Sequence, residues 1–372
     1  MTGGGNVAKG KATIYDVADV ACVSIATVSR VLNGAAHVRP ETRDRVTDAI
    51  KQLQFVPSSA ARSLSGGKKW SIGLVYPLDE NQATFSPSQE EDASVLFTDA
   101  LIRGASTQAA LRGYSLFACA VRPGFESGMT PLERISSSVD GIILSDRVAN
   151  DLGAMRITKR MRAVHLSGTG AVKFGATLRV DNEGGIQAVV AHLAAAHGVR
   201  DFGFVAGIPD SPDALSRQQA FVAAVNAAGG RVRPENVLTG NFSMMRAEAE
   251  MEARLAQPSA LPEVFVCAND QMALGVVHTL AQHGRRVPED VLVTGFDDIP
   301  LARTSRPGLT TVAQPSFQLG VAAVNLVVGL LDGEVEKGSM VTMPTELVLR
   351  DSCGCVQGAS AGAQELLMRG AS

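Results

Sequence analysis

A short stretch near the N-terminus carries the residues best suited to recognising another molecule. In a helix that begins at Ser24, the outer face would present Ile25, Ala26 and Arg30 together. The arginine fork matches the O6 and N7 acceptors of guanine, and small apolar groups contact the methyl of thymine. Polar side chains in and around such a helix suit phosphate contacts, which set register but carry no sequence information. The candidates for phosphate contact are Tyr15, Thr27 and Asn33.

The cysteines and histidines give no pattern of a metal centre or a catalytic site. Five cysteines and six histidines are scattered along the chain, without zinc-site spacing. We interpret the C-x-C pair Cys353 and Cys355 as packing residues, and on one helical stretch we expect His192 at the surface and His197 in the core. Residues 168–173 (GTGAVK) lack the third glycine of a dinucleotide fingerprint, and no Ser/His/Asp or Cys/His arrangement has a recognisable context. We therefore predict no metal, no cofactor and no enzymatic activity.

Three short helices over residues 13–54 would position the polar stretch. Thr13 and Asp16 have capping-box-like spacing at the start of the first helix, and Ser24 suits the cap of the second. Only Cys22-Val23 separates these two helices, and so tight a link makes them cross steeply, as in a helix-turn-helix. A plain three-helix bundle with a solvated polar face is the alternative on these grounds.

The charge distribution separates a basic head from an acidic body. The chain of 372 residues is too long for one ordinary domain, and its formal net charge is -3. Residues 1–70 carry ten Lys/Arg and five Asp/Glu, whereas acidic residues are in excess over the remainder. This favours a contact between the head alone and a polyanion. The Gly-rich residues 1–11 lack the apolar run of a signal peptide, and we expect no membrane span.

From Ser71 onward, short apolar runs alternate with amphipathic stretches. This alternation predicts an α/β core of parallel sheets covered on both faces, and its length suits two lobes. Ligands of such folds bind at the carboxyl ends of the strands, so we expect a site between the lobes. The strand candidates are residues 71–76, 114–121, 141–145, 162–167, 202–207, 263–268 and 291–296, and the helix candidates include residues 98–112, 184–197, 213–228 and 270–283.

Residues 57–64 (PSSAARSL) connect the head to the core. The segment is compatible with a helix, but an isolated helix of about eight residues is not stable in water. It is therefore expected to become ordered only on binding. The alternative is a flexible linker in which Leu64 packs on the core.

Residues 12–64 resemble the head of the lactose-repressor/galactose-repressor (LacI/GalR) family of transcription regulators, most specifically through VSIATVSRVLNG at residues 23–34. The resemblance implies that the outer face of the second helix enters the major groove, where Ile25, Ala26 and Arg30 read bases. It also implies that the hinge helices of two subunits pair in the minor groove, with Leu64 wedged into the central base step. The residues it assigns to the DNA backbone are Tyr15, Ser24, Thr27, Ser29, Asn33 and His37.

Two departures from the family pattern bear on the stability of the head. Cys22 stands where the family often has glycine or asparagine, and a positive φ there would cost about 1 kcal/mol. Arg39 stands where a serine cap usually precedes Pro40, and the loss of that cap costs about 1 kcal/mol. We expect a head that is marginally stable until DNA or the dimer supports it.

The core resembles the same family and, through it, the periplasmic sugar-binding fold. The matching segments are VDNEGG (180–185), CANDQMALG (267–275), VTGFDDIPLA (293–302), LTTVAQP (309–315) and LVLRDSCG (347–354). The resemblance implies three crossings between two lobes. It assigns Arg217, Asn269 and Asp297 to polar groups of an effector and Phe242 to stacking on an apolar sugar face. The alternatives are helix or loop capping for Asn269 and Asp297, and a surface ion pair for Arg217.

These inferences give a domain organisation. The lobe boundaries come from the three crossings that the resemblance implies. We expect a disordered tail (1–11), a helix-turn-helix domain (12–56), a hinge helix and linker (57–70), an effector-binding and dimerisation core (71–357) and a flexible tail (358–372). Within the core, we place lobe one at about 71–168 and 297–325, and lobe two at about 169–296 and 326–357.

The expected function is that of a dimeric, cytoplasmic, nucleoid-associated repressor that binds a near-palindromic operator under the control of a small molecule. A sugar or sugar derivative, and hence carbohydrate metabolism, is the first expectation. Two departures leave another effector open: Ser167-Gly168 replaces an acidic residue common in the family, and residues 79–93 are unusually polar and acidic. The operator, the direction of the effector's influence and a tetrameric state also stay open. The competing functions are a solute-binding transport protein and an enzyme.

Overall fold

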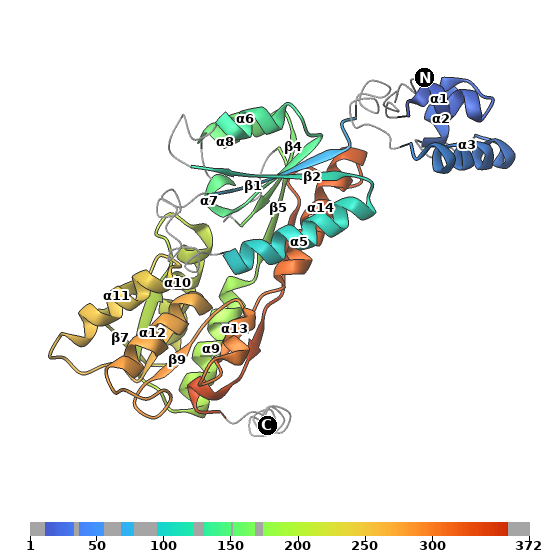
Figure 1. The fold of residues 1–372 in the computed structure, drawn as a ribbon. Helices are drawn as coiled ribbons and strands as arrows, with labels where there is room; N and C mark the ends of the chain where they lie inside the picture. The colour runs from blue at the N-terminus through green and yellow to red at the C-terminus, as the bar shows by residue number, and fades with distance from the viewer. Residues whose placement is uncertain are drawn as a thin grey trace, which may run out of the picture. The chain divides into compact units, whose positions relative to one another are not determined.

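The computed structural model describes residues 12–32, 37–55, 68–77, 95–122, 130–149, 152–167 and 174–355. These residues belong to two compact units, Met1–Trp70 and Ser71–Ser372 (Figure 1). The expected tails, the hinge over 57–67, and the contact residues Asn33 and Leu64 lie outside the described residues.

The first unit is a bundle of three short helices, α1 (Ile14–Val20), α2 (Ile25–Leu32) and α3 (Pro40–Leu53). At the start of α1, the Thr13 hydroxyl accepts from the Asp16 N–H, and the Asp16 carboxylate accepts from the Thr13 N–H at 2.7 Å, so the predicted capping box is confirmed. In the link to α2, Cys22 has a φ of 50°, so the cost of about 1 kcal/mol that a positive φ would bring applies at this position.

The core of the head is built from the inward faces of all three helices. Its fully or largely buried residues are Val17, Ala18, Ala21, Val28, Val46, Ala49 and Phe55. Arg39 gives α3 no side-chain cap, as its residue type predicts, and Gln54 ends the helix in the left-handed conformation. With α1 and α2 both packed on α3, the outer face of α2 is left without a helix over it within the described part of the head.

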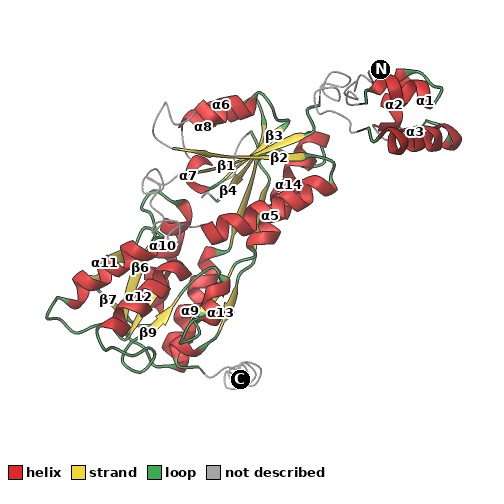
Figure 2. Ribbon diagram, in the orientation of Figure 1, coloured by secondary structure: helices red, strands yellow, loops and turns green. Residues whose placement is uncertain are grey.

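Lobe one of the core is a parallel sheet with the strand order β11-β5-β4-β3-β1-β2. Its strands are β1 (Ser71–Pro77), β2 (Ser115–Val121), β3 (Gly141–Leu144), β4 (Arg162–Leu166), β5 (Ala176–Val180) and β11 (Met340–Met343). Its helices are α5 (Val95–Leu111), α6 (Thr130–Ser136), α7 (Asp146–Ala149), α8 (Leu152–Thr158) and α14 (Ser316–Asp332). Helices α5 and α14 pack together on one side of the sheet, and α6 and α8 contact each other on the other (Figures 1 and 2).

Lobe two has a second parallel sheet in the order β7-β6-β8-β9. Its strands are β6 (Asp201–Ala206), β7 (Arg231–Thr239), β8 (Val264–Cys267) and β9 (Leu292–Thr294). Its helices are α9 (Asn182–Ala196), α10 (Pro212–Ala227), α11 (Met244–Leu255), α12 (Asp270–Gln282) and α13 (Pro300–Thr304). A two-stranded ladder of β10 (Thr311–Ala313) and β12 (Glu346–Val348), with the 3-10 turn η4 (Asp351–Cys353), completes this lobe.

The chain passes between the lobes three times, as expected, but not at the expected residues. Strand β5 pairs with β4 and β11, so lobe one continues through residue 180 instead of ending at 168. Residues 297–313 belong to lobe two because Ala302, Leu309 and Val312 lie in its core cluster. The expected boundaries at 168/169, 296/297 and 325/326 are therefore wrong, and the crossings lie near residues 181, 315 and 344.

Helix α14 belongs wholly to lobe one, where its backbone lies almost against that of α5. A Cβ on Gly104 would lie 2.0 Å from the Phe317 carbonyl oxygen, and one on Gly320 would lie 2.2 Å from the Leu101 carbonyl oxygen. Only glycine permits this approach. The contact explains why the helix cannot be divided between the lobes at residue 325.

Among the described residues, no helix has the length and apolar character that crossing a membrane would require.

Candidate functional site

The outer face of α2 is open to solvent, as its sequence predicts. Ile25 is 40% exposed, and Ala26 and Arg30 are also exposed, while Val28 on the opposite face is fully buried. The predicted base-reading residues therefore share one accessible surface. This surface has the apolar and guanidinium groups that fit the major-groove edges of base pairs.

The described backbone-contact candidates lie on α1, on α2 and its N-cap, and in the segment before α3. Ser24 is exposed and caps α2: its Oγ accepts from the Thr27 N–H at 3.2 Å and lies 2.9 Å from the Thr27 hydroxyl. Tyr15 is 64% exposed on α1, His37 is exposed ahead of α3, and Ser29 is half-buried. Tyr15 and His37 therefore offer exposed hydroxyl and imidazole groups from the segments before and after α2, groups of the kind that contact phosphates.

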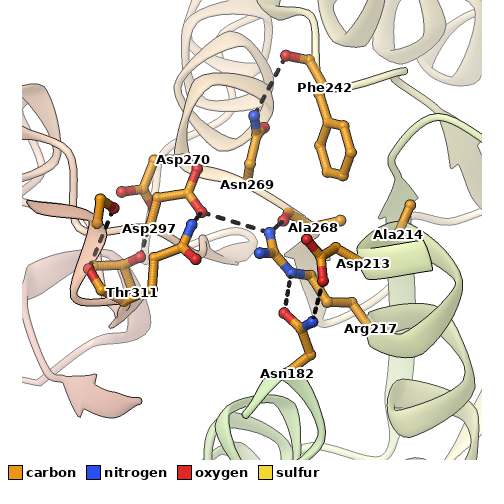
Figure 3. Close-up of polar contacts among 12 residues, drawn as sticks. Asn182, Asp213, Ala214, Arg217, Phe242, Ala268, Asn269, Asp270, Asp297 and Thr311 are labelled. Atoms are coloured by element: carbon orange, nitrogen blue, oxygen red, sulfur yellow. Dashed lines mark hydrogen bonds and ion pairs between the residues drawn. The ribbon is translucent and has the colours of Figure 1, made fainter. Parts of the chain in front are cut away.

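A second site is built around one buried arginine in lobe two. Arg217 on α10 is 4% exposed. Its Nε donates to Asn182 Oδ1 at 2.8 Å, and its Nη1 donates to the Ala268 carbonyl oxygen at 2.6 Å (Figure 3). Nη1 also lies 3.5 Å from Asp297 Oδ1. We call Arg217, Asn182, Asp213, Asp297 and Gln314 the Arg217 cluster. Among the described residues, Nη2 of Arg217 has no hydrogen-bond acceptor.

The elements of lobe two bring the Arg217 cluster to the carboxyl ends of its strands. Asn182 begins α9 directly after lobe one ends, Arg217 lies on the helix that follows β6, and Asp297 lies just after β9. This is the edge at which parallel α/β sheets bind ligands. The surface-ion-pair alternative for Arg217 is wrong, because its side chain is buried and bonded to backbone and amide groups.

Asp213 connects the Arg217 cluster to lobe one. Its Oδ1 accepts from Asn182 Nδ2 at 2.7 Å, and its Oδ2 accepts a short hydrogen bond from the hydroxyl of Ser167 at the end of β4. A second pair, Arg147 Nε to Asp210 Oδ1 at 3.0 Å, joins α7 to the loop before α10. Lobe two therefore supplies a carboxylate at the position where lobe one has Ser167 in place of an acidic residue.

Asp297 has both a raised side-chain pKa and an unusual backbone conformation. Burial raises the pKa of its carboxyl to about 6, and the nearby Asp213 adds to the rise, while Arg217 and a hydrogen bond from Gln314 Nε2 oppose it. Its φ of 120° is rare for a residue with a side chain. Strained backbone of this kind is concentrated at functional sites. Ile299, and not Asp297, is the N-cap residue of α13, so the helix-capping alternative for Asp297 is wrong.

A second buried carboxyl lies behind Asp297. Asp270 is fully buried at the start of α12, and burial, followed by the charge of Asp297, raises its pKa well above the ordinary value. It accepts from the Thr311 hydroxyl at 2.5 Å and from the Ile299 N–H at 2.9 Å. These contacts hold the loop that carries Asp297 against lobe two.

Two aromatic rings bound the Arg217 guanidinium. The Phe296 ring centroid lies 3.7 Å from its central carbon, and the Phe242 centroid lies 5.9 Å away. The Phe242 ring also occupies the space that a side chain at residue 207 would need, since a Cβ on Gly207 would lie 2.3 Å from it. Figure 3 shows the predicted stacking residue Phe242 across the site from Asp297.

Asn269 is the N-cap of α12, so the alternative role predicted for it, helix capping, is confirmed. Its Oδ1 accepts from the Met272 N–H at 2.9 Å, and its Nδ2 donates to the Phe242 carbonyl oxygen at 3.3 Å. These bonds fix the strained loop of Phe242, whose φ is 60°. Asn269 thereby supports the position of the aromatic ring as well as the helix.

Four members of this site were not predicted from the sequence: Asn182, Asp213, Phe296 and Gln314. Asp213 could have been found, because it precedes Arg217 by four residues and so shares its helix face. Asn182 lies within the VDNEGG segment but carries no signal of its own. Gln314 becomes a partner only through the fold.

Both units of the chain match known protein families. The model of bacterial regulatory proteins of the lacI family matches residues 13–58, and the model of periplasmic binding protein-like domains matches residues 190–353. The chain is 32% identical over 345 residues to the HTH-type transcriptional repressor PurR of Pasteurella multocida, covering 92% of this chain and 98% of the relative. It is 28% identical over 347 residues to Catabolite control protein A of Priestia megaterium, covering 91% and 98%.

Solved structures agree over the same span. A lac repressor dimer bound to operator and the anti-inducer ONPF has a TM-score of 0.75 and 26% identity, with 92% of this chain and 99% of that chain covered. A complex of the transcriptional regulator CelR with cellobiose has a TM-score of 0.66 and 28% identity, also covering 92% and 99%.

Proposed function

The chain belongs to the lacI family of bacterial regulatory proteins, and on that premise we propose how its two sites work together. It is a sequence-specific, DNA-binding transcriptional regulator of the repressor type, and a small-molecule effector controls its affinity for the operator. The observation that carries this is the match to a repressor that extends over both units, with 92% of this chain and 98% of the relative aligned.

The head reads the operator with α2. Ile25 and Ala26 contact base edges, Arg30 bonds to guanine, and residues around them hold the phosphates. The remaining contacts that we propose come from Tyr15, Ser24, Thr27, Ser29, Asn33, His37 and the wedged Leu64. The exposure of Tyr15, Ser24 and His37 supports the proposal, and the half-buried Thr27 and Ser29 lie on α2, the helix that Ser24 caps. Two copies of the chain bind a near-palindromic site, because the symmetry of a dimer requires symmetry in its DNA.

The Arg217 cluster binds the effector, together with Phe242 and with Asn269 as the residue that holds the Phe242 loop. The cluster offers guanidinium donors, carboxylate acceptors and amides that do both. Hydroxyl groups can pair with all three, and the aromatic rings suit the apolar face of a sugar ring. We therefore propose a sugar or another polyol, a class to which the cellobiose of the CelR complex also belongs.

Effector binding changes the contacts between the lobes. The hydrogen bond from Ser167 to Asp213 and the ion pair of Arg147 with Asp210 join lobe one to α10 and to the loop before it. A ligand that pairs with Asp213 and Arg217 competes with these contacts between the lobes and so changes how strongly the lobes are held together. The resulting movement of lobe one changes the spacing of the hinge segments in the dimer. Such coupling amounts to about 1–3 kcal/mol and is reciprocal between the two ligands.

In this function the polar groups of the site bind the effector, and none of them carries out a chemical reaction. The PurR relative of Pasteurella multocida is a transcriptional repressor. A regulator of this kind acts where the chromosome lies, so we propose a cytoplasmic, nucleoid-associated location.

The effector proposal is tested by a thermal-shift screen of sugars, sugar phosphates and nucleobases against the full chain. A ligand at 100 times its dissociation constant adds about 2.7 kcal/mol of stability. A hit should change operator affinity, and operator DNA should change affinity for the hit by the same factor.

Variants at Arg217 locate the site. Arg217→Lys should lose the stabilisation by the hit. Arg254→Lys is the matched control, because Arg254 is also fully buried in lobe two but bonds to Asn236 and to loop carbonyls outside the cluster. Equal stabilisation of both variants by the hit would refute the assignment of the effector to the Arg217 cluster.

A further inference from the structure

Four side chains with metal-binding chemistry meet in lobe two, at the end of α9 away from the Arg217 cluster. His192 lies near the end of α9 and His197 is its C-cap residue, while Cys353 ends η4 and Cys355 follows two residues later. Each offers one ligand atom, and the four atoms lie within 4.8 Å of one another. Two sulfurs and two imidazole nitrogens thus converge from segments that are far apart in the chain.

The spacing of these four atoms fits a tetrahedral zinc ion. Zinc binds sulfur at about 2.3 Å and imidazole nitrogen at about 2.0–2.1 Å, so a tetrahedron puts two nitrogens about 3.3 Å apart and a sulfur about 3.6 Å from a nitrogen. The two Nε2 atoms lie 3.2 Å apart, and Cys355 Sγ lies 3.4 Å from each. Cys353 Sγ lies 3.9 Å from Nε2 of His192. These four distances differ from the tetrahedral values by a few tenths of an ångström at most, and the two remaining pairs lie within the 4.8 Å that spans the set.

The backbone presents these groups as a preformed set. Gly354 has a φ of 85°, and this left-handed residue turns the chain so that the sulfurs on both sides of it face the histidines. The Thr310 hydroxyl donates to Cys353 Sγ at 3.0 Å, a contact of the kind that orients metal ligands. Cys353 is fully buried, and the other three residues are half-buried.

We propose that His192, His197, Cys353 and Cys355 bind one zinc ion per chain in a structural site. Two thiolates and two imidazoles in a tetrahedral arrangement are a ligand set for zinc, whereas magnesium and calcium prefer oxygen. Four protein ligands fill the coordination sphere, so the ion has no open position for a substrate or an activated water.

The ion joins α9 to the last described segment of the chain. That segment returns to lobe two after the third crossing, where Ser352 Oγ donates to the Val293 carbonyl oxygen at 2.6 Å. The metal adds a bond between this returning segment and α9. Asn182, at the other end of α9, lies about 15 Å from His192 at the helical rise. The zinc site is therefore separate from the effector site.

The test is the metal content of the untagged full chain, purified under reducing conditions and dialysed against metal-free buffer. Mass spectrometry of the metals should find about one zinc per chain. Competition with a chromophoric chelator should then give the zinc affinity. Cys355→Ser and His197→Gln should each weaken it by at least about 100-fold, since even the loss of an outer-shell partner costs about 10- to 100-fold.

Two controls keep the result specific. Cys119→Ser removes a half-buried cysteine from β2 in the other lobe and should leave the zinc affinity unchanged. Replacing zinc by cobalt in the unaltered chain should give the intense visible bands and the sulfur charge transfer of a tetrahedral site, a readout that needs no variant to fold. A chain without bound zinc, an octahedral cobalt spectrum, or equal affinities in Cys355→Ser and Cys119→Ser would each overturn the proposal.

Discussion

Replacing Asp297 by asparagine should change the way the stability of the core depends on pH. The Asp297 side chain is only 9% exposed, and burial is the main reason that its pKa rises to about 6 from an ordinary 3.8. Asparagine has the same shape, and its Oδ1 can still accept from Arg217 and Gln314. The substitution therefore removes the titration while it keeps most of the geometry.

The sign follows from proton linkage. The folded pKa lies above the unfolded one, so the stability contributed by the carboxyl is complete below pH 3.8 and is lost as the pH rises through 6. At about 1.4 kcal/mol per pKa unit, the loss amounts to about 3 kcal/mol between pH 4 and pH 6. Asparagine at position 297 also removes the charge that raises the pKa of Asp270, which changes the slope in the same direction.

His165 changes the free energy of unfolding in the opposite direction over nearly the same pH range. It is 5% exposed in β4, and burial lowers its pKa from 6.5 to about 4. Its contribution is therefore present above pH 6.5 and is lost as the pH falls through 4, by about 3 kcal/mol. Between about pH 4 and pH 6, the titrations of His165 and Asp297 nearly cancel in the unaltered chain. Removal of either titratable side chain should therefore leave the pH dependence that the remaining one causes visible in the unfolding free energy.

The assay is urea unfolding of the full chain at pH 4.5, 5.5, 6.5 and 7.5, followed by circular dichroism. Relative to the unaltered chain, Asp297→Asn should gain about 2–3 kcal/mol of unfolding free energy from the lowest to the highest pH, and His165→Gln should lose a similar amount. A constant cost of either substitution cancels in this comparison. A difference from the unaltered chain that does not vary with pH would refute the reasoning for that residue.

Three further substitutions test the head and the hinge. Cys22→Gly should stabilise the head by about 1 kcal/mol, because φ is 50° there, and should slow amide hydrogen exchange in α1–α3 about fivefold; faster exchange would count against it. Arg30→Ala should cost about 1–3 kcal/mol per half-site and relax the preference at one base pair, and an unchanged preference in a binding-site selection would contradict this. Leu64→Ala should weaken specific binding far more than non-specific binding at fixed salt, whereas equal losses would exclude the wedge.

The head could be predicted almost completely, because its signals are local. The capping box at Thr13, the two-residue link at Cys22 and the first-turn Pro40 each involve neighbours in the chain. All seven strands of the predicted list likewise overlap observed strands with small shifts, since buried parallel strands read as continuous apolar runs. Strand β7 was missed because it lies at the edge of its sheet, with Pro234 and alternating exposure in place of an apolar run.

The lobe boundaries and half of the effector site could not be predicted because they depend on contacts between distant segments. Nothing in the residues of β5 shows that it pairs with β11, which follows it by about 160 residues. The partners of Arg217 come from three such segments. The histidine and cysteine pairs are separated by a similar length of chain, so their spacing in the sequence gave no sign that they meet.

The central claim is that α2 of a pair of identical subunits reads a specific sequence in duplex DNA. Its most direct test is a selection from random duplexes with the full chain, followed by affinities for the enriched and a scrambled duplex at the same salt concentration. The account predicts an enriched near-palindrome bound at least about 1,000-fold more tightly than the scrambled duplex. No enriched sequence, or equal affinities with and without candidate metabolites, would contradict it.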